Sequence, residues 1–165
     1  MTNARVLIVE DEMVIAHDIK NRLNRLGYEV IGIVDNGEQA IEKASALKPD
    51  IVLMDIQIEG CMQGIEAAKE IYKSYDIPVV YITAYSDERT LEQAKLTEPF
   101  GYILKPFNDR DIHSAIEIGL YKHKKENELK AGKTGKKRTI ELIKELPNYQ
   151  KKSGYIICLD ILVIY

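Results

Sequence analysis

Four short apolar runs, each followed at once by polar residues, limit what this chain can fold into. The runs are Val6–Val9 before Glu10 and Asp11, Ile51–Met54 before Asp55, Val79–Ile82 before Thr83, and Tyr102–Leu104 before Lys105. A run that is apolar throughout indicates a strand buried on both faces, as in a parallel sheet covered by helices. Open parallel sheets bind ligands at the carboxyl ends of their strands. We therefore expect three carboxylates, one hydroxyl and one ammonium around one crevice, a set that suits a divalent cation and a phosphoryl group.

Helical patterns alternate with these runs, which predicts an α/β fold built from βα units. The expected strands cover about 5–9, 29–34, 51–55, a segment opened by Pro78 and a segment ending at Lys105; the expected helices cover about 13–26, 38–47, 65–74 and 88–96, and a last helix begins at Asn108 or Asp109. Five βα units in about 125 residues fit one compact domain. The predicted fold is a (βα)5 doubly wound, parallel, five-stranded sheet with an extended last helix.

The last expected helix changes character along its length. Its inward apolar stripe ends at Leu120, and polar residues without a core-facing side follow Tyr121. We expect the helix to extend past Lys125 as a linker, and we expect Gly132 and Gly135 to end it.

The domain boundaries follow from this change. Residues 4–125 are expected to form one domain, and 126–165 a helical linker with a basic and apolar tail, in which Thr139–Leu146 is a possible amphipathic helix before Pro147. By direct count, residues 1–128 carry 15 Lys and Arg against 23 Asp and Glu, a net of −8, and residues 129–165 carry 8 against 3, a net of +5, which together return −3. Basic tails of this kind contact acidic partners.

Composition narrows the class of protein. Hydrophobic residues make up 45% and charged residues 30%, as in a globular protein. No run approaches the roughly 20 apolar residues of a membrane helix, and because the first strand begins at about residue 5 we expect no signal peptide. Cys61 and Cys158 lack metal-ligand spacing. We expect a reduced, cytoplasmic setting and no membrane partner.

Together these residues resemble the receiver domain of two-component response regulators. The matching pieces are Leu7–Glu12, Leu53–Asp55, Ile82–Ala84 and Leu104–Phe107. They stand in the family's order, each at the end of an expected strand, and the resemblance covers roughly residues 4–125. It implies a receiver-like sheet with the flavodoxin-like strand order 2-1-3-4-5.

The resemblance implies a role for each acidic residue of the crevice. Asp55 is the nucleophile, which accepts a phosphoryl group from a partner histidine kinase or phosphotransfer protein. Mg²⁺ is held by Asp11 and Asp55, by Glu10 directly or through water, and by the backbone carbonyl of Gln57. The chain is then a phospho-acceptor and not an enzyme, apart from its own phosphorylation and dephosphorylation.

The resemblance also implies a switch. Lys105 pairs with one phosphoryl oxygen and Thr83 hydrogen bonds to another. The inward movement of Thr83 lets Tyr102 rotate into the vacated space, and the fourth helix, fifth strand and fifth helix present the change to a partner. Plain core packing is the alternative role for Tyr102. The Lys105–Pro106 peptide bond is expected to be cis.

Surfaces for partners are less clearly marked. Met13, Val14 and His17, with Phe107, form either a kinase-docking patch or ordinary packing. The family often dimerises through its fourth and fifth helices. The loop Ile58–Gly64 departs from the family pattern, because it lacks a proline and is one residue longer, which leaves the lifetime of the phosphoryl group open.

Three other functions fit parts of the sequence. The basic residues of 130–152 fit a DNA-binding transcription regulator. However, the 36 residues of 130–165, interrupted by Pro147, are too few for a helix-turn-helix unit with its own core. A Mg²⁺-dependent phosphohydrolase with an Asp55 nucleophile needs a second acid, and Gln57 stands where one is expected. A flavin binder would place phosphate beside the acidic Glu10–Glu12. We therefore expect a receiver, without a nucleic-acid partner.

Overall fold

The computed structural model of the chain describes residues 4–84 and 99–144, with side chains described as far as residue 132. The chain divides into two units, Met1–Lys125 and Glu126–Tyr165. The helix expected over 88–96 and the part of the tail after residue 144 lie outside the described residues.

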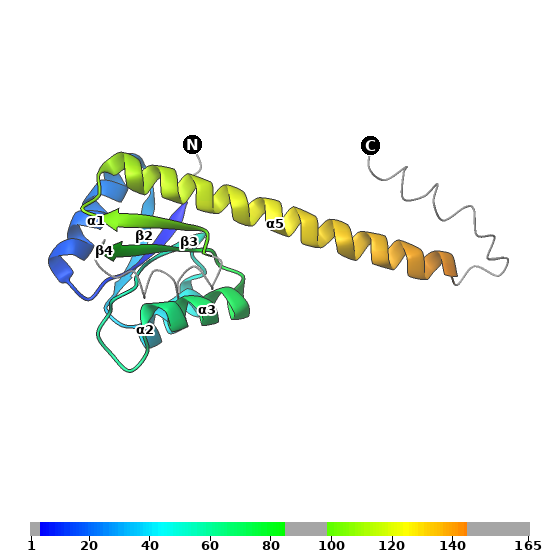
Figure 1. Cartoon of the computed structure of the whole chain (residues 1–165), viewed down its shortest axis with the longest axis horizontal. Coiled ribbons are helices and arrows are strands. Elements are labelled where there is room, and N and C mark those ends of the chain that lie inside the picture. Colours follow the sequence, from blue (N-terminus) through cyan, green and yellow to red (C-terminus); the bar gives the residue numbers. More distant parts are fainter. Residues whose placement is uncertain (1–3, 85–98, 145–165) are drawn as a thin grey trace. The chain divides into compact units, whose positions relative to one another are not determined.

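The described residues form one parallel sheet with helices on both of its faces (Figure 1). The elements in chain order are β1 (Arg5–Val9), α1 (Met13–Leu26), β2 (Glu29–Val34), α2 (Gly37–Leu47), β3 (Ile51–Asp55), α3 (Gly64–Tyr75), β4 (Val79–Ala84), β5 (Gly101–Lys105) and α5 (Asp109–Lys144). Neighbouring strands pair in parallel in the order β2-β1-β3-β4-β5. The predicted fold class and strand order are confirmed.

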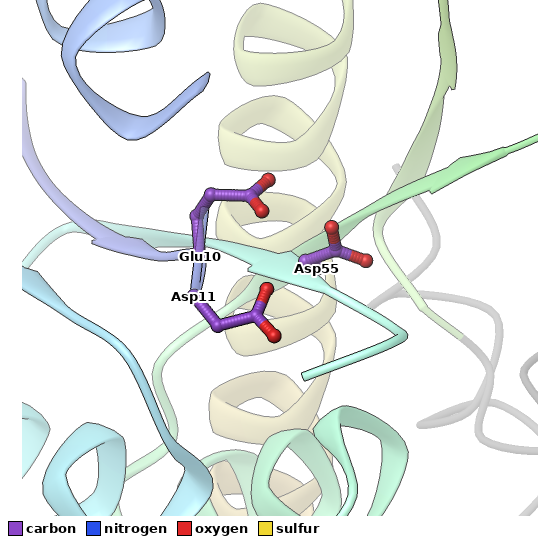
Figure 2. Close-up of side chains that lie close together, drawn as sticks. All are labelled: Glu10, Asp11 and Asp55. Atoms are coloured by element: carbon purple, nitrogen blue, oxygen red, sulfur yellow. The ribbon is translucent and has the colours of Figure 1, made fainter. Parts of the chain in front are cut away.

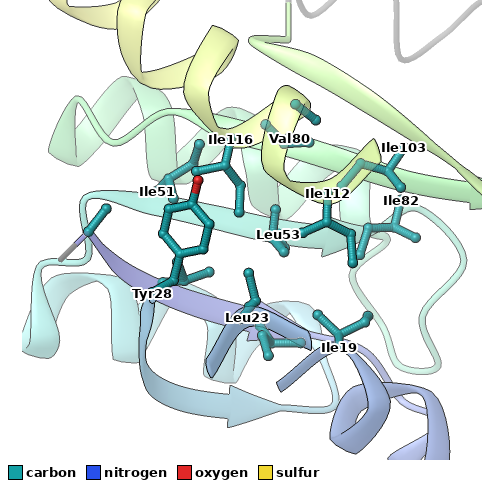
Figure 3. Close-up of a cluster of buried hydrophobic side chains, with 14 of the residues drawn as sticks. Ile19, Leu23, Tyr28, Ile51, Leu53, Val80, Ile82, Ile103, Ile112 and Ile116 are labelled. Atoms are coloured by element: carbon teal, nitrogen blue, oxygen red, sulfur yellow. The ribbon is translucent and has the colours of Figure 1, made fainter. Parts of the chain in front are cut away.

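Alternate residues of the central strands supply two separate cores. On one face, β1 and β3 pack against α1 and α5, and Figure 3 shows this core with Ile19 and Leu23 of α1 near Ile112 and Ile116 of α5. On the other face, Leu7 and Val9 of β1 pack with residues of α2 and α3. Since β1 and β3 are buried on both sides, their continuous apolar runs are explained.

Particular residues end or begin the helices that lie beside the sheet. Helix α1 ends at Gly27, whose φ of 87° is a left-handed conformation that glycine adopts without steric cost. Helix α2 begins after Asn36, whose side chain accepts a hydrogen bond from the backbone N–H of Gln39 at 2.9 Å. Because the strands are parallel, the residues at which β1, β3, β4 and β5 end all lie at the same end of the sheet.

Helix α5 is long, as predicted, but its end differs from the prediction. Gly132 and Gly135 do not terminate it, because the helix continues to Lys144. Each glycine costs about 1 kcal/mol relative to alanine, which the surrounding Lys, Glu and Leu residues can offset. Among the described helices, none is both long enough and apolar enough to cross a membrane.

Candidate functional site

Three carboxylates converge where β1 and β3 end. Glu10 and Asp11 directly follow β1, and Asp55 is the last residue of β3. One carboxylate oxygen from each lies within 4.8 Å of the others, and Figure 2 shows the side chains of Glu10 and Asp11 extending toward the side on which Asp55 lies. The register explains the meeting, because Val9 of β1 pairs with Met54 of β3 and the next residues are Glu10 and Asp55.

The site contains the buried polar side chains of the described domain. Glu10 is 0% exposed, Thr83 3% and Asp55 4%, and they are the polar or charged residues classed as buried among the described residues. Burying a charged group costs free energy unless it is paired. The gathering of these buried polar side chains at one end of the strands therefore indicates a functional site. Acidic residues of an ordinary surface loop would be exposed.

Lys105 supplies the positive charge of the site. Its Nζ lies 3.0 Å from Oε2 of Glu10 and 2.5 Å from Oδ2 of Asp55. Lys105 ends β5, and its register partner is Ala84 of β4, so its long side chain reaches past β4 to the acids. The ammonium thus bridges two of the three carboxylates predicted from sequence.

The negative charges of the site exceed its positive charge, which favours the binding of a further cation. Burial, followed by the charge of Asp55, raises the pKa of Glu10 from 4.5 to about 7, although Lys105 opposes the rise. Burial alone would lower the pKa of Lys105, but hydrogen bonds to Asp55 and Glu10 outweigh it and raise that pKa. When Glu10 is also deprotonated, the three carboxylates and one ammonium leave a net charge of −2, which a bound cation would favour. Hard oxygen donors with this excess charge fit a divalent cation such as Mg²⁺.

Backbone N–H groups complete the site, and sequence reasoning missed them. The N–H of Gln57 donates to Oδ1 of Asp55 at 2.8 Å, and the N–H of Glu59 donates to Oδ2 of Asp11 at 3.1 Å. The N–H of Glu12 donates more weakly to Oε1 of Glu10 at 3.3 Å. Backbone N–H groups do not depend on the type of residue, so the sequence does not show which of them will act as donors. The unusual loop after Asp55 was the only feature of the sequence that pointed to this region.

The two residues of the predicted switch lie on β4 and β5. The hydroxyl of Thr83 donates to the carbonyl of Ala84 at 3.2 Å. The ring of Tyr102 lies 5.9 Å from that of Tyr81, its register partner on β4. Among the described residues, the buried hydroxyl of Tyr102 has no hydrogen-bond partner. Burial, followed by the effect of Tyr81, raises the pKa of Tyr102 to about 12.

The loops around the site carry the remaining predicted features. The Lys105–Pro106 peptide bond is cis. Met13 is 52% and Val14 85% exposed at the start of α1, whereas Phe107 is partly buried against the core on the α1 and α5 face. The candidate docking patch is therefore exposed at Met13, Val14 and His17 and only partly exposed at Phe107.

Comparison with known proteins places this site in a family. A sequence model described as the response regulator receiver domain matches residues 6–117. The chain belongs to this receiver family. Its relatives include the transcriptional regulatory protein PdtaR of Mycobacterium tuberculosis, 39% identical over 116 residues, which are 70% of this chain and 56% of that protein. Another is the phyllosphere-induced regulator PhyR of Methylorubrum extorquens, 36% identical over 117 residues, which are 70% of this chain and 43% of that protein.

Solved structures agree with the fold. The signal receiver domain of a modulated diguanylate cyclase from Desulfovibrio desulfuricans is 40% identical, with a TM-score of 0.71 over 74% of this chain and 98% of that one. The N-terminal domain of a response regulator from Carboxydothermus hydrogenoformans is 33% identical, with a TM-score of 0.67 over 74% of this chain and 98% of that one. This chain spans only about half of the curated relatives that it matches, 56% of PdtaR and 43% of PhyR.

Proposed function

We propose that the chain is a response-regulator receiver in which Asp55 accepts a phosphoryl group from a histidine kinase or phosphotransfer protein, in a Mg²⁺-dependent reaction. One observation carries this proposal: the Asp55 carboxylate is nearly buried, bridged by Lys105 and surrounded by Glu10 and Asp11. Membership of the receiver family supports it. Burying a carboxylate beside other acids costs free energy, so this arrangement at the end of the strands indicates a functional role.

The chemistry of the transfer is a substitution at phosphorus. An oxygen of Asp55 attacks the phosphorus of a phosphohistidine, the O–P bond forms, the N–P bond breaks, and the electron pair returns to the imidazole. Lys105, already beside Asp55, would hold an oxygen of the transferring group. Thr83 would hydrogen bond to another once its hydroxyl turns from the carbonyl of Ala84.

The acids and one backbone group would hold the cation. Asp11 and Asp55 are the direct ligands in this proposal, with Glu10 acting directly or through water and the carbonyl of Gln57 adding a further oxygen. Bound Mg²⁺ supplies charge neutralisation to the transferring phosphoryl group. The proposed role is that of a phospho-acceptor and not of an enzyme acting on other substrates, because Gln57 provides no second acid for hydrolysis.

The switch would act through Thr83 and Tyr102. The buried hydroxyl of Tyr102 supports this part of the proposal, because it has no hydrogen-bond partner within residues 4–84 and 99–132 and an unsatisfied buried hydroxyl costs about 1–3 kcal/mol. This cost favours a second ring position in which the hydroxyl finds a partner, and a phosphoryl group that recruits Thr83 would open the space for it. The surface that changes would be the fourth helix with β5 and α5.

The partners would use different faces. The exposed Met13 and Val14 at the start of α1 lie beside Glu10 and Asp11 in the chain, and we propose them as part of the contact with the kinase. Leu104 of β5 and Ile118 and Tyr121 of α5 are 43%, 51% and 63% exposed. Apolar exposure of this kind would support a homodimer that uses the fourth and fifth helices.

The central test is phosphorylation of the full chain by a small acyl phosphate in Mg²⁺. Mass spectrometry should show the addition of one phosphoryl group, which chelation with EDTA abolishes and which Asp55→Asn eliminates. Asp18→Asn is the matched control, because Asp18 lies exposed on α1 and pairs with Arg22 of the same helix. An adduct that persists in Asp55→Asn, or no adduct in the unaltered chain, would contradict the proposal.

A second candidate, DNA binding through the basic tail, rests on the +5 charge of residues 129–165. PdtaR, a relative, is named as a transcriptional regulatory protein, although this chain covers only 56% of it. Electrostatic DNA binding weakens steeply as salt rises. A shift of duplex DNA at low salt that disappears at high salt would support this candidate, and the absence of any shift would remove it.

A further inference from the structure

The first residue of α3 touches the proposed phospho-acceptor through the backbone. An ideal Cβ built on Gly64 would overlap the carbonyl oxygen of Asp55 and would lie 3.1 Å from the Cα and carbonyl oxygen of Ile56. These are main-chain atoms, which cannot move aside as the end of a flexible side chain can. An ordinary C···O contact would require Gly64 and Asp55 to separate by roughly 1 Å more.

This contact closes the loop that forms part of the site. Residues 56–63 leave Asp55 at the end of β3 and return to it at Gly64, the start of α3. Within the loop, the N–H of Gln57 donates to Asp55 at 2.8 Å and the N–H of Glu59 donates to Asp11 at 3.1 Å. The backbone groups that orient two of the three carboxylates therefore belong to a loop whose two ends meet at Gly64.

A second glycine supports the same loop from the neighbouring helix. A Cβ on Gly37, the first residue of α2, would lie 3.0 Å from the carbonyl oxygen of Met62 and 3.1 Å from its Cγ. Gly119 of α5 is also closely packed, but its nearest atoms are side-chain ends, Cδ1 of Ile51 at 3.1 Å and Cγ2 of Val80 at 3.2 Å. Gly64 and Gly37 thus approach the site loop, whereas Gly119 approaches the core.

We propose that Gly64 is a positioning residue for the phosphoryl-acceptor site. Because it has no side chain, α3 can begin against the Asp55 carbonyl, and this holds the Asp55 carboxylate and the N–H and carbonyl groups of Gln57 in place for the cation and the incoming phosphorus. The inference rests on the proposed function. The loop Ile58–Gly64 contains no proline that would fix a backbone angle.

A purely structural role would have a different signature. A glycine that only fills space would change the free energy of unfolding when replaced, without changing the Mg²⁺ affinity of the folded protein. A positioning residue changes the geometry of the ligands, and displacements near 1 Å reduce catalytic rates by about 100-fold. Mg²⁺ affinity and phosphorylation rate, compared with stability, distinguish the two roles.

The experiment compares Gly64→Ala with Gly119→Ala in the full chain. Calorimetry measures Mg²⁺ affinity at a temperature where each variant is folded, and mass spectrometry measures the rate of phosphorylation by a small acyl phosphate at saturating Mg²⁺. Gly64→Ala should weaken Mg²⁺ binding about tenfold and slow phosphorylation about 100-fold. Gly119→Ala should change both by less than about twofold, because Gly119 packs on Ile51, at the opposite end of β3 from Asp55.

A second measurement follows the loop itself. In the unaltered chain, the NMR signals of the Gln57 and Glu59 amides should shift when Mg²⁺ is added, and in Gly64→Ala they should already be displaced without it. If Gly64→Ala does not fold, Gly37→Ala provides the test, because it presses on Met62 without touching Asp55. It should weaken Mg²⁺ binding about threefold, a smaller loss than the tenfold expected for direct displacement of the site.

The outcomes separate this inference from the function on which it rests. The positioning role alone is overturned if Gly64→Ala folds and then binds Mg²⁺ and accepts a phosphoryl group like the unaltered chain. The same result for Gly37→Ala, used in its place, has the same meaning. Equal losses in Gly64→Ala and Gly119→Ala also overturn it, since they indicate general destabilisation. An unaltered chain that neither binds Mg²⁺ nor is phosphorylated overturns the proposed function and this inference together.

Discussion

At the scale of single residues, the site is a balance between buried charges of opposite sign. Lys105 contacts Glu10 and Asp55, both almost fully buried, at 3.0 and 2.5 Å. Removing one partner of such a pair leaves an uncompensated charge and costs about 3–5 kcal/mol. The metal-free site is therefore held together by Lys105, and its excess negative charge is available to a cation.

The protonation of Glu10 should make the stability of the metal-free protein depend on pH. Its pKa is raised from 4.5 to about 7 in the folded state, so the folded state holds the proton more tightly than the unfolded chain does. The contribution of this group is complete below about pH 4.5 and is lost as the pH rises through about 7. In EDTA, urea denaturation should show a loss on the order of 3 kcal/mol between pH 5 and pH 8. Glu10→Gln should flatten this dependence, and an unchanged slope in that variant would assign it to another group.

The buried hydroxyl of Tyr102 leads to a prediction of increased stability. Tyr102→Phe should increase the free energy of unfolding by about 1 kcal/mol, because it removes a buried hydroxyl that has no hydrogen-bond partner in the described part of the chain. The matched control is Tyr28→Phe, whose hydroxyl is hydrogen bonded to His113 at 2.7 Å and to Glu117 at 2.8 Å. That variant should lose about 1–3 kcal/mol. Urea denaturation of both measures the difference, and a loss of stability in Tyr102→Phe would show that its hydroxyl is satisfied.

At the scale of elements, the start of α5 is fixed by its cap and by its contact with α1. Oδ1 of Asn108 accepts hydrogen bonds from the N–H groups of Arg110 and Asp111, at 2.8 and 3.1 Å, and Asp111 accepts one from the N–H of Asn108 at 2.9 Å. Asp109 pairs with Arg22 of α1 at 2.7 Å. The cap satisfies N–H groups that have no partner within the helix, and it sets where α5 begins after Lys105.

Replacement of the cap residue tests its contribution. Asn108→Ala should lower the free energy of unfolding by about 1 kcal/mol, because two N–H groups at the start of α5 lose their acceptor. Asn108→Asp keeps an acceptor oxygen at the same place and should stay close to the unaltered chain. Thermal denaturation of the two variants measures this difference, and equal losses would show that the amide group, rather than capping, is what matters.

At the scale of the whole molecule, both cores are built within the first unit. Their buried residues run from Ala4 to Ile116, and the packed side chains at their margin end at Leu120. The division of the chain at residues 125 and 126 falls just beyond them. The candidate site residues, from Glu10 to Lys105, also lie in this unit.

Truncation after Lys125 should therefore leave a folded receiver. We expect its melting temperature to stay within about 4 °C of the full chain, which corresponds to a change below roughly 1 kcal/mol, and its Mg²⁺ affinity to be unchanged. Truncation after Ala115 is the contrasting control, because it removes Ile116, which is 0% exposed, and should unfold the domain. Circular dichroism and calorimetry compare the two. Loss of folding in the longer fragment would show that residues beyond 125 contribute to the core.

The sequence by itself determined the strands, their order along the chain and the acids, hydroxyl and ammonium at their ends. It could do so because a strand buried on both faces has to be apolar throughout, so each polar residue that ends a run stands out. It misjudged the end of α5, since two glycines lower helix propensity by an amount that neighbouring residues offset.

Only the tertiary structure decided how the site is held. The contacts of the Gln57 and Glu59 N–H groups, the lack of space at Gly64 and the burial of the Tyr102 hydroxyl depend on which atoms meet in space. Backbone groups are the same at every position except proline, and steric room depends on residues distant in the sequence. Side-chain chemistry can therefore be predicted from the order of residues, whereas the close approach of α3 to Asp55 exists only after the chain has folded.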